Sequence, residues 1–537
     1  MKRREFLKKS SAAMLASMAA TPGSLFSEPS TGRRPNVLLF FTDEHHASVL
    51  GCAGHPLVKT PNLDLLAKDG IRYERAYCQD GICVPSRTSV ATGLYPRTTG
   101  MLTNIDPLMC PDQLRTLQET LKENGYQTAA FGKRHLVSEN PDIKYRNAKT
   151  REFHTNRGWD RTASVIVPAL EPSDEDYRTW LTGRGKLQVF QKDENCKGVL
   201  DARVSELDPD ETMSAYVNLK TTEWLKQRRD PNKPFFCYSS FYHPHYNVTP
   251  TSNWARLYDP AAITLPASLN QDPKTIPPGW SNENRSMYKR VGSSSEQSWR
   301  LYIAHYLACV AEIDYCIGNI IKALKDIGEY DNTVILFSSD HGDFLGEHRL
   351  VGKNSFWESG MHVPFIAHYP NAFQKGQVKS DLVELVDLFP TILDITGTLV
   401  PPGYPFAGRS LLPSFTKGTP VGRKYAVCED WTCVTIVGER YKLVHWIETP
   451  DPKRDMRSFG DVLFDRVADP GEVKNFMGQP GTADAEEELR SYLKEWTANT
   501  PDDGKQKCFP VSCQIWERDY ARRPPAKKPN TTPKPVA

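Results

Sequence analysis

Ionisable side chains follow four apolar segments of the sequence, at the point where each segment ends. In chain order they are Asp43 and Glu44, Lys133 and His135, His243 and His245, and Asp340, His341 and Asp343. Each group by itself could do no more than cap a helix. Ligands of open α/β sheets bind beyond the carboxyl ends of the strands, so four such groups together indicate one shared site.

The side chains in this set favour metal and anion chemistry. Asp43, Glu44 and Asp340 offer hard oxygen donors and His341 offers one imidazole, a set that suits a divalent cation such as Ca²⁺ or Mg²⁺. Positive charge and proton donors come from Lys133, His135, His245 and Lys353. A metal with a ring of cations is what a tetrahedral anion needs, because several negative oxygens must be held at once.

A thiol opens the segment "CVPSRTSVATG" (83–93). Pro85 fits the first turn of a helix, and such a helix would direct its amide dipoles at Cys83. The thiol could be a nucleophile, a metal ligand, half of a disulfide or a small core residue. A thiolate prefers softer ions than the carboxylate set would hold, so its place beside a hard-metal site is chemically odd.

The elements that must position these groups follow from the apolar pattern. Continuous apolar runs predict buried strands at 36–41, 128–132, 235–242 and 333–339. An amphipathic helix is predicted over 114–125, ending at Gly125, and the apolar stripe of 302–324 predicts a second helix whose stripe is core. The polar segment 140–230 predicts insertions around the site, and 260–298 is typical of a long loop.

The pattern changes after about residue 418. A hairpin turning near Gly438 is predicted over 432–446, a strand and turn over 462–475, and a helix over 484–496. We therefore predict an α/β fold, with a large central, mostly parallel or mixed sheet sandwiched by helices. A smaller C-terminal α+β subdomain, an antiparallel sheet plus one helix, completes it. The predicted ranges are 31–418 for the catalytic domain, 419–520 for the subdomain and 521–537 for a disordered tail.

Residues 1–30 predict an export signal. Arg3 and Arg4 open a basic stretch that resembles a bacterial twin-arginine signal, and the apolar stretch after it is too short to cross a bilayer. We expect a periplasmic or secreted protein with no transmembrane segment in the mature chain. The net charge of +2 gives no global basic field, so no nucleic-acid partner is expected.

Twelve cysteines are too few for a disulfide scaffold in a chain of 537 residues. Two pairs are close enough in sequence to bond in an oxidising compartment: Cys428 with Cys433, and Cys508 with Cys513.

The segment Cys83–Val84–Pro85–Ser86–Arg87 resembles the formylglycine signature of the type I sulfatases, a family of the alkaline phosphatase-like superfamily. "GYQTAAFGKRH" (125–135) is similar to the second signature of that family. The motifs "TDEHH", "YHPH", "SSDHGD" and "GKNSFWE" follow in the family's order, and the resemblance covers nearly the whole mature chain.

The resemblance implies that Cys83 is converted to formylglycine (3-oxoalanine), whose hydrate is held by a metal. The implied ion is Ca²⁺, with Mg²⁺ as second choice, and its ligands are residue 83, Asp43, Glu44, Asp340 and His341. Glu44 stands where many members have a second Asp. A formylglycine-generating maturase is implied as a partner.

The resemblance also implies roles for the remaining site residues. One hydroxyl of the hydrate would attack sulfur, and the other would then lose its proton to His135 and expel sulfate. Arg87 would hold the hydrate. Lys133, His245 and Lys353 would grip the sulfate oxygens and assist the leaving group.

The function expected is an exported sulfatase acting on a sulfated sugar or oligosaccharide. One alternative is a phosphodiesterase or phosphonate monoester hydrolase of the same superfamily, which can share these residues. A second is a glycan-binding protein that kept the fold and lost catalysis, although every position such a copy would lose is still present.

Overall fold

The computed structural model describes residues 33–104, 114–136, 157–165, 177–195, 198, 200–272, 275–276, 294–353, 356–400, 402–448 and 455–501. The predicted export signal, the predicted Cys508–Cys513 pair and the predicted tail lie outside the described residues. In the described part of the chain, no helix has both the length and the apolar character needed to cross a membrane.

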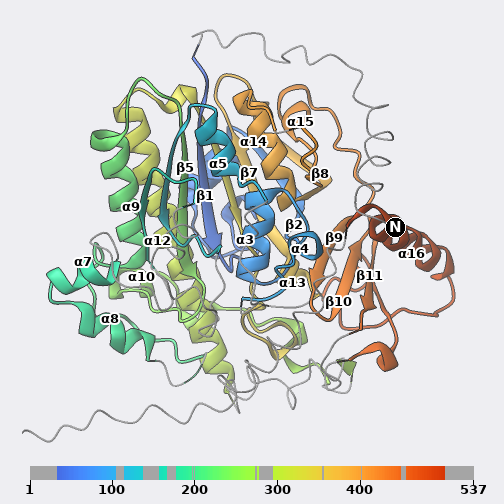
Figure 1. The fold of residues 1–537 in the computed structure, drawn as a ribbon. Helices are drawn as coiled ribbons and strands as arrows, with labels where there is room; N and C mark the ends of the chain where they lie inside the picture. The colour runs from blue at the N-terminus through green and yellow to red at the C-terminus, as the bar shows by residue number, and fades with distance from the viewer. Residues whose placement is uncertain are drawn as a thin grey trace, which may run out of the picture.

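Eight strands form one large mixed sheet at the centre of the molecule (Figure 1). Their order across the sheet is β4-β3-β5-β1-β6-β7-β2-β8. β7 runs antiparallel to both of its neighbours, and the other neighbouring pairs in this sheet are parallel. The strands are β1 Asn36–Asp43, β2 Ile71–Tyr77, β3 Gln127–Gly132, β4 Arg161–Ala163, β5 Phe235–Pro244, β6 Thr333–Ser339, β7 His362–His368 and β8 Gln377–Glu384.

Helices cover both faces of this sheet, which explains why its central strands carry apolar residues on both faces over most of their length. Val37, Leu39 and Phe41 of β1 point into one core, and Leu38 and Phe40 point into the other. The first core contains residues of α3 Cys83–Thr92, α5 Leu117–Glu123, α14 Leu388–Thr396 and α15 Leu412–Lys417. The second contains residues of α2 Pro61–Lys68, α7 Tyr177–Gly183, α8 Leu187–Glu194, α9 Met213–Glu223 and α12 Glu296–Asp326.

A second, four-stranded antiparallel sheet follows in the chain, with the order β12-β11-β10-β9. Gly438 N–H donates to the Tyr441 carbonyl at 2.9 Å in the predicted hairpin turn. Leu489 and Trp496 of the last helix pack against Ile436 and Leu443 of this sheet. The elements are β9 Ala426–Asp430, β10 Cys433–Val437, β11 Tyr441–Trp446, β12 Val462–Asp465 and α16 Ala483–Asn499. The predicted α/β fold with a C-terminal α+β unit is confirmed.

The four predicted buried strands are confirmed as β1, β3, β5 and β6. The helix predicted over 114–125 begins later, at Leu117, because Thr116 and Glu119 form a capping box at its start. Gly125 follows its end with φ 87°, a conformation that suits glycine.

Two segments contain more structure than the sequence pattern indicates. Within 140–230, α9 buries Met213, Tyr216 and Val217, although its sequence shows no clear helical stripe. Within 260–298, α12 already begins at Glu296, where the Ser295 hydroxyl accepts a hydrogen bond from the Ser298 N–H as an N-cap. The end of that predicted loop is therefore helix.

The predicted Cys428–Cys433 disulfide is absent, and both residues are free thiols. Cys428 lies opposite Thr435 across β9 and β10, and Cys433 lies opposite Asp430. The two cysteines are thus diagonal neighbours, for which Cα separations of about 7–8 Å are typical. A disulfide needs roughly 4.4–6.8 Å.

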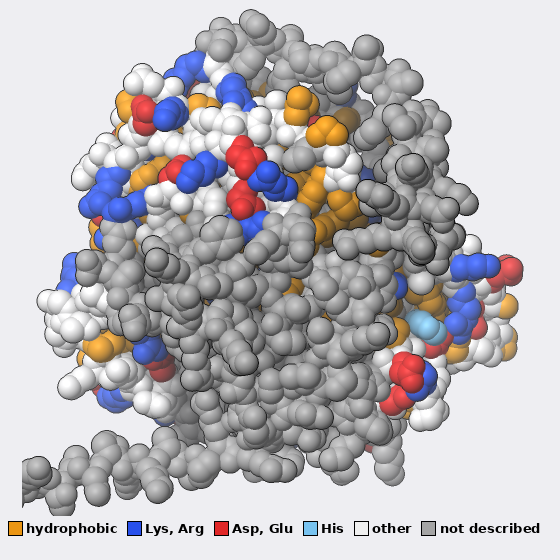
Figure 2. Space-filling model, in the orientation of Figure 1, with side chains coloured by type: hydrophobic (Ala, Val, Ile, Leu, Met, Phe, Trp, Pro, Cys, Tyr) orange, Lys and Arg blue, Asp and Glu red, His pale blue; other side chains and the backbone are white. Residues whose placement is uncertain are grey.

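The described surface carries both signs of charge. On the face shown in Figure 2, Lys and Arg side chains lie close to Asp and Glu side chains over the large sheet. This distribution agrees with the net charge of +2.

Candidate active site

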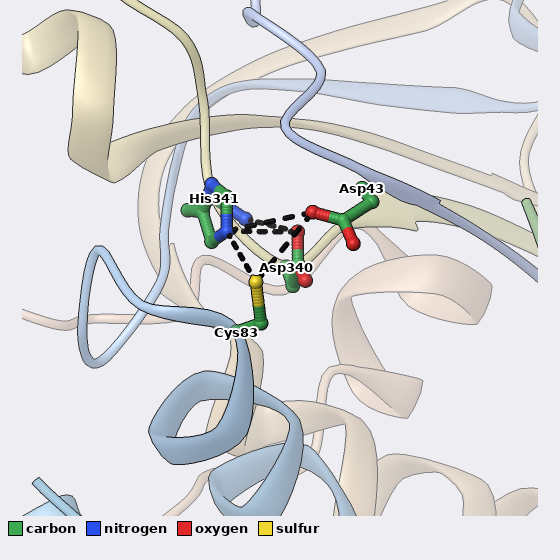
Figure 3. A group of neighbouring side chains, drawn as sticks. All are labelled: Asp43, Cys83, Asp340 and His341. Carbon is green, nitrogen blue, oxygen red and sulfur yellow. Dashed lines mark hydrogen bonds and ion pairs between the residues drawn. The ribbon is translucent and has the colours of Figure 1, made fainter. Parts of the chain in front are cut away.

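Cys83 is the first residue of α3, and its side chain is 1% exposed. The helix begins there because Ile82 is extended and Pro85 occupies the first turn, where a missing N–H breaks no intrahelical bond. Gly93 ends it in the left-handed conformation, with φ 69°. Figure 3 shows that the sulfur points away from α3 toward Asp43, Asp340 and His341.

Four ligand atoms from three elements converge at this point. The Cys83 sulfur lies 3.3 Å from His341 Nε2 and 3.7 Å from Asp43 Oδ1. His341 Nε2 lies 3.6 Å from Asp43 Oδ1 and 3.5 Å from Asp340 Oδ1. These groups could hold a metal ion, because all four atoms are within 4.8 Å of one another and all four residues are buried.

A hydrogen bond fixes which nitrogen of His341 faces this point. Nδ1 lies 3.0 Å from the Gly342 carbonyl, to which it can only donate. Nε2 of the neutral ring therefore presents its lone pair to the carboxylates and the sulfur, as in a metal-binding histidine whose other nitrogen is held by a backbone carbonyl.

The buried carboxylates fit a cation. Asp43, Glu44 and Asp340 have no exposed surface. Burial and the neighbouring Asp343, Asp43 and Cys83 raise the pKa of Glu44 well above its usual value, although Lys353 opposes the shift. Because like charges at this separation repel, a divalent ion would stabilise the ionised set. Asp43, Asp340 and His341 would be its ligands, and Glu44 lies beside them.

Arg87 crosses behind the carboxylates, one helical turn after Cys83. Its Nε donates to Asp340 Oδ2 at 2.7 Å, and its Nη1 donates to the carbonyl of Lys133 at 2.8 Å. The guanidinium is 2% exposed. It holds Asp340 and the start of the Lys133 segment in place and makes no contact with the sulfur that the structure records.

Two lysines also reach the sulfur. Lys353 Nζ lies 2.9 Å and Lys133 Nζ 3.4 Å from Cys83 Sγ. Lys133 also makes a close ion pair with Asp43. Burial would raise the pKa of the Cys83 thiol, but Lys133, Lys353 and His341 together hold it well below its usual value. The site therefore stabilises negative charge where residue 83 lies.

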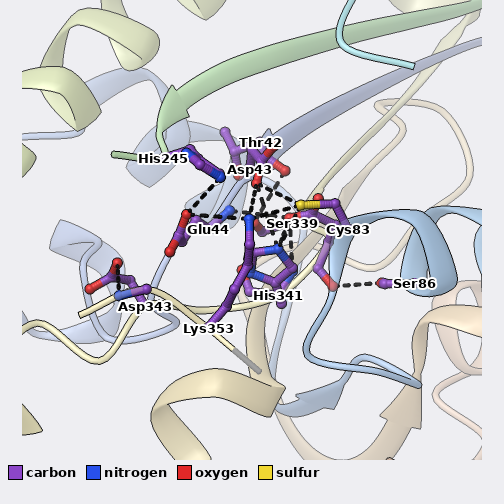
Figure 4. Close-up of polar contacts among 12 residues, drawn as sticks. Thr42, Asp43, Glu44, Cys83, Ser86, His245, Ser339, His341, Asp343 and Lys353 are labelled. Atoms are coloured by element: carbon purple, nitrogen blue, oxygen red, sulfur yellow. Dashed lines mark hydrogen bonds and ion pairs between the residues drawn. The ribbon is translucent and has the colours of Figure 1, made fainter. Parts of the chain in front are cut away.

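His245 lies beside Glu44 in the same site (Figure 4). Its Nε2 lies 3.3 Å from Glu44 Oε2, and Lys353 Nζ lies 3.6 Å from the same oxygen. Nδ1 is held by the carbonyl of Tyr246. Burial and Lys353 lower the pKa of His245.

His135 follows β3 in the left-handed conformation, with φ 50°. This uncommon conformation turns the chain at the end of the strand. The ring lies close enough to contribute to the lowered pKa of Cys83. All the site residues predicted from the sequence are thus brought to one end of the large sheet.

Sequence reasoning missed the residues that hold this set from behind. The Tyr306 hydroxyl donates to the Glu44 carbonyl at 2.5 Å and accepts from His46 N–H at 2.9 Å. Tyr302 reaches Asp343 Oδ2 at 3.3 Å. Tyr306 belongs to the apolar stripe of α12 that was predicted to be core, and Tyr302 lies one turn before it in the same helix, so that prediction was incomplete. The sequence did contain a signal for this role, because an aliphatic residue would pack equally well at either position, and a tyrosine there indicates a use for its hydroxyl.

Two further supports come from β5. Tyr238 and Ser240 accept from Arg87 Nη1 at 2.9 and 3.0 Å. They are two residues apart, so both point to the same face of the strand. Polar side chains at this spacing inside an otherwise apolar run indicate a polar partner on that face.

The sulfatase family model matches residues 35–398. The chain belongs to the sulfatase family. A second model, for the C-terminal region of N-sulphoglucosamine sulphohydrolase, matches residues 346–499. The predicted family resemblance is confirmed, and the chain is a sulfuric ester hydrolase.

Relatives span most of the chain. It is 26% identical to the N-acetylglucosamine-6-O-sulfatase of Bacteroides thetaiotaomicron, over 90% of this chain and 91% of the relative. It is 30% identical to the iduronate 2-sulfatase of Homo sapiens, over 75% of each chain. Both relatives are named for action on sulfated sugars.

Solved structures share the fold. The phosphonate monoester hydrolase of Agrobacterium radiobacter superposes with a TM-score of 0.73 at 24% identity, covering 87% of this chain and 96% of that one. BT4656, solved with its substrate D-glucosamine-2-N,6-O-disulfate, gives 0.66 at 24% identity, covering 88% and 99%.

Proposed function

We propose that this sulfatase hydrolyses sulfate esters of a carbohydrate, with residue 83 converted to formylglycine and Ca²⁺ held beside it. The observation that carries the proposal is the position of Cys83. It lies at a helix start, where it meets both the group Asp43, Asp340 and His341 and two lysine ammoniums. Sulfated-sugar enzymes among the relatives support the substrate class.

Lys133 and Lys353 bind the anion. Both ammoniums lie within 3.4 Å of Cys83 Sγ, so a sulfate that meets residue 83 also meets two cations. Such charge-assisted hydrogen bonds hold the sulfate oxygens and favour the transition state, in which negative charge is spread over them.

The converted residue 83 supplies a hydroxyl that attacks sulfur and a second hydroxyl that later expels sulfate. When bound, the cation neutralises charge on the ester and on the attacking hydroxyl. Arg87 keeps Asp340 oriented. His135, which lies near residue 83, would take the proton of the second hydroxyl as sulfate leaves.

His245 serves the leaving group. The Nδ1 proton is held by the carbonyl of Tyr246, so His245 acts as an acid through Nε2, in its imidazolium form. The S–O bond to the sugar breaks as the alkoxide oxygen takes that proton, so the products are a free sugar hydroxyl and a sulfated residue 83. General acid assistance of this kind is worth roughly 10²–10⁴-fold.

A phosphonate monoester hydrolase is the second candidate, because one shares the fold at a TM-score of 0.73. The same lysines would hold a phosphonate, so geometry does not separate the two. Initial rates on matched phenyl sulfate and phenyl phosphonate esters separate them. We expect the higher kcat/KM on the sulfate, and a higher kcat/KM on the phosphonate would replace our proposal with the alternative.

The substrate class is tested with a panel of sulfated mono- and oligosaccharides, with release of inorganic sulfate as the readout. Peptide mass spectrometry of the same preparation should show residue 83 as an aldehyde. Full activity with a free thiol at 83 would overturn the formylglycine proposal.

We also propose that the chain is exported to the periplasm or beyond, on the basis of the twin-arginine-like amino end. Fractionation of a bacterial host, with Arg3→Lys/Arg4→Lys as the comparison, tests this. Equal export of the variant and the parent would count against a twin-arginine route.

A further inference from the structure

The four converging ligand atoms have the spacing of a tetrahedral zinc site as long as residue 83 is a thiol. Four of the six separations among Cys83 Sγ, His341 Nε2, Asp43 Oδ1 and Asp340 Oδ1 run from 3.3 to 3.7 Å, and the other two are within 4.8 Å. Zinc bonds of about 2.0 Å to oxygen and nitrogen and 2.3 Å to sulfur place neighbouring ligands of a tetrahedron about 3.3–3.8 Å apart.

We propose that the unconverted, thiol form of this chain is a zinc site, with Cys83, His341, Asp43 and Asp340 as the four ligands. Conversion of residue 83 then changes the metal that the site prefers. The second statement rests on the proposed formylglycine function, whereas the first concerns the chain as it is translated.

The donor atoms explain the change of metal. The four donors are one sulfur, one imidazole nitrogen and two carboxylate oxygens, a borderline-soft set that suits Zn²⁺. Ca²⁺ takes six to eight oxygen ligands, and this set offers it only two. Conversion removes the sulfur and puts oxygen in its place. The set then becomes mostly hard oxygen, and the preference moves toward Ca²⁺.

Neighbouring groups already hold the four ligands in this arrangement. The Gly342 carbonyl fixes the His341 ring, and Arg87 fixes Asp340 through Oδ2. Oδ1 of Asp340 accepts from the backbone N–H groups of Glu44 and His341, which orient it toward His341 Nε2 at 3.5 Å. Lys353 and Lys133 can donate to the sulfur and offset the negative charge of a thiolate with two carboxylates. Such outer contacts are what orient ligands in metal sites.

A consequence follows for chains that escape conversion. Because Cys83 is 1% exposed at the start of α3, a folded thiol chain gives a modifying enzyme almost no access to it. Zinc bound by the sulfur would close the site further. Unconverted protein would thus be an inactive zinc protein that added calcium does not rescue.

The experiment uses full-length protein made without converting activity, with the thiol at 83 verified by mass spectrometry. Metal-free protein is titrated with Zn²⁺ in competition with a chelating dye, and with Cd²⁺ as a spectroscopic probe. We expect one Zn²⁺ per chain, and a thiolate-to-cadmium charge-transfer band in the ultraviolet. A hundredfold excess of Ca²⁺ should leave both unchanged.

Three variants sharpen the result. Cys83→Ala should lose the cadmium band and weaken zinc binding by more than about 100-fold, since even loss of an outer contact costs 10–100-fold. His341→Asn should keep the band and weaken zinc binding. Cys52→Ala, which removes a partly exposed thiol away from the site, should change neither. Unfolding curves of each variant establish that it is folded.

Absence of the band in the folded thiol form, or displacement of Zn²⁺ by Ca²⁺, would overturn the zinc site. These readouts need no turnover and no converted protein. If the thiol form binds zinc but no preparation hydrolyses sulfate esters, the proposed function fails and the zinc site stands.

Discussion

Glu44 and Glu358 are both largely enclosed glutamates, but their surroundings act on them in opposite directions. Burial and nearby acidic groups raise the pKa of Glu44 well above its usual value. Burial also acts to raise the pKa of Glu358, yet Arg466, Lys442 and His362 lower it to about 2. Glu44 lies in the catalytic cluster, by which we mean the predicted site residues gathered at one end of the large sheet, and Glu358 lies at the seam between the two sheets.

The seam cluster, which we define as Tyr77, Glu358, Lys442, Arg466 and Glu472, is joined by ion pairs and hydrogen bonds between donors and acceptors. Arg466 Nη2 lies 3.2 Å from Glu358 Oε2, and Lys442 Nζ lies 3.5 Å from Glu358 Oε1. Lys442 also makes a close ion pair with Glu472. The Tyr77 hydroxyl donates to Glu358 at 3.0 Å. Two carboxylates thus meet two cations that come from β11 and the residue after β12.

The catalytic cluster arranges its groups differently. Asp43 Oδ1, Asp340 Oδ1, His341 Nε2 and the Cys83 sulfur face one another, although each is an electron-pair donor. A shared cation at its centre would stabilise such an arrangement further, beyond what Lys133 and Arg87 contribute. The two clusters therefore differ in what meets at the centre: four ligand atoms that could share one cation in the first, and ion-paired donors and acceptors in the second.

The largest effect is expected from Asp340→Asn, which breaks the convergence itself. The variant should lose bound metal and at least about a thousandfold in kcat/KM, because the anion and the attacking hydroxyl lose their electrostatic support. Metal content by mass spectrometry and sulfate release are measured together. Asp331→Asn, at an exposed carboxylate, is the control. Retention of metal and turnover by Asp340→Asn would show that the ligand assignment is wrong.

His245→Ala should have the next largest effect, and only on some substrates. A sugar alkoxide is a poor leaving group, so kcat on a sugar sulfate should fall by roughly 10²–10⁴-fold. A nitrophenyl sulfate, whose phenolate leaves without a proton, should lose much less. His445→Ala, at a half-exposed histidine of β11, controls for loss of an imidazole. Equal losses on both substrates would mean that His245 binds sulfate and does not protonate the leaving group.

Lys442→Met tests the seam cluster. It leaves Glu472 and part of Glu358 uncompensated in the interior, so the free energy of unfolding should fall by about 3–5 kcal/mol. Urea unfolding measures this change, and kcat per folded molecule should stay near that of the parent.

The double variant Lys442→Met/Glu472→Gln is the matched control, because it removes both charges of the pair. It should recover part of the loss. A loss below about 1 kcal/mol in the single variant would show that the seam contributes little to stability.

The sequence predicted the position of the catalytic cluster far better than that of the seam cluster, because the site residues stand next to the predicted strands in the sequence. Asp43, Lys133, His245 and Asp340 each follow an apolar run directly, so the parallel strands bring them to one edge of the sheet whatever the details of packing. The convergence of strand ends is a property of the fold class.

No such rule places Glu358 beside Lys442. The first precedes β7 and the second lies in β11, and their contact depends on how the small sheet docks on the large one. The contacts of Tyr302 and Tyr306 could not be predicted for a similar reason. A stripe of apolar and aromatic residues does not indicate which tyrosine hydroxyl contacts a neighbouring loop. Contacts that depend on how the small sheet packs against the large one have no short-range pattern in the sequence that would predict them.

The last prediction compares the two glutamates directly, as Glu358→Gln and Glu44→Gln in metal-free protein. The pKa of Glu358 is about 2 in the folded state and about 4.5 when unfolded, so its ionised form stabilises the fold above about pH 4.5. That contribution is lost as pH falls toward 2, and it amounts to about 3 kcal/mol. Glu358→Gln should therefore be less stable than the parent at pH 7, and the difference should shrink in acid.

Glu44→Gln should show the opposite sign. A carboxyl whose folded pKa is raised destabilises the fold progressively as pH rises above its unfolded pKa, so removal of its charge should stabilise the metal-free protein at pH 7 and have little effect near pH 4. Urea unfolding between pH 3 and pH 7 with a chelator present measures both. Added metal should reverse the gain of Glu44→Gln and leave Glu358→Gln unchanged, since only one of the two carboxyls adjoins the ligand group. If the free energy of unfolding at pH 7 changed with the same sign in both variants, the proposed difference between the catalytic cluster and the seam cluster would be wrong.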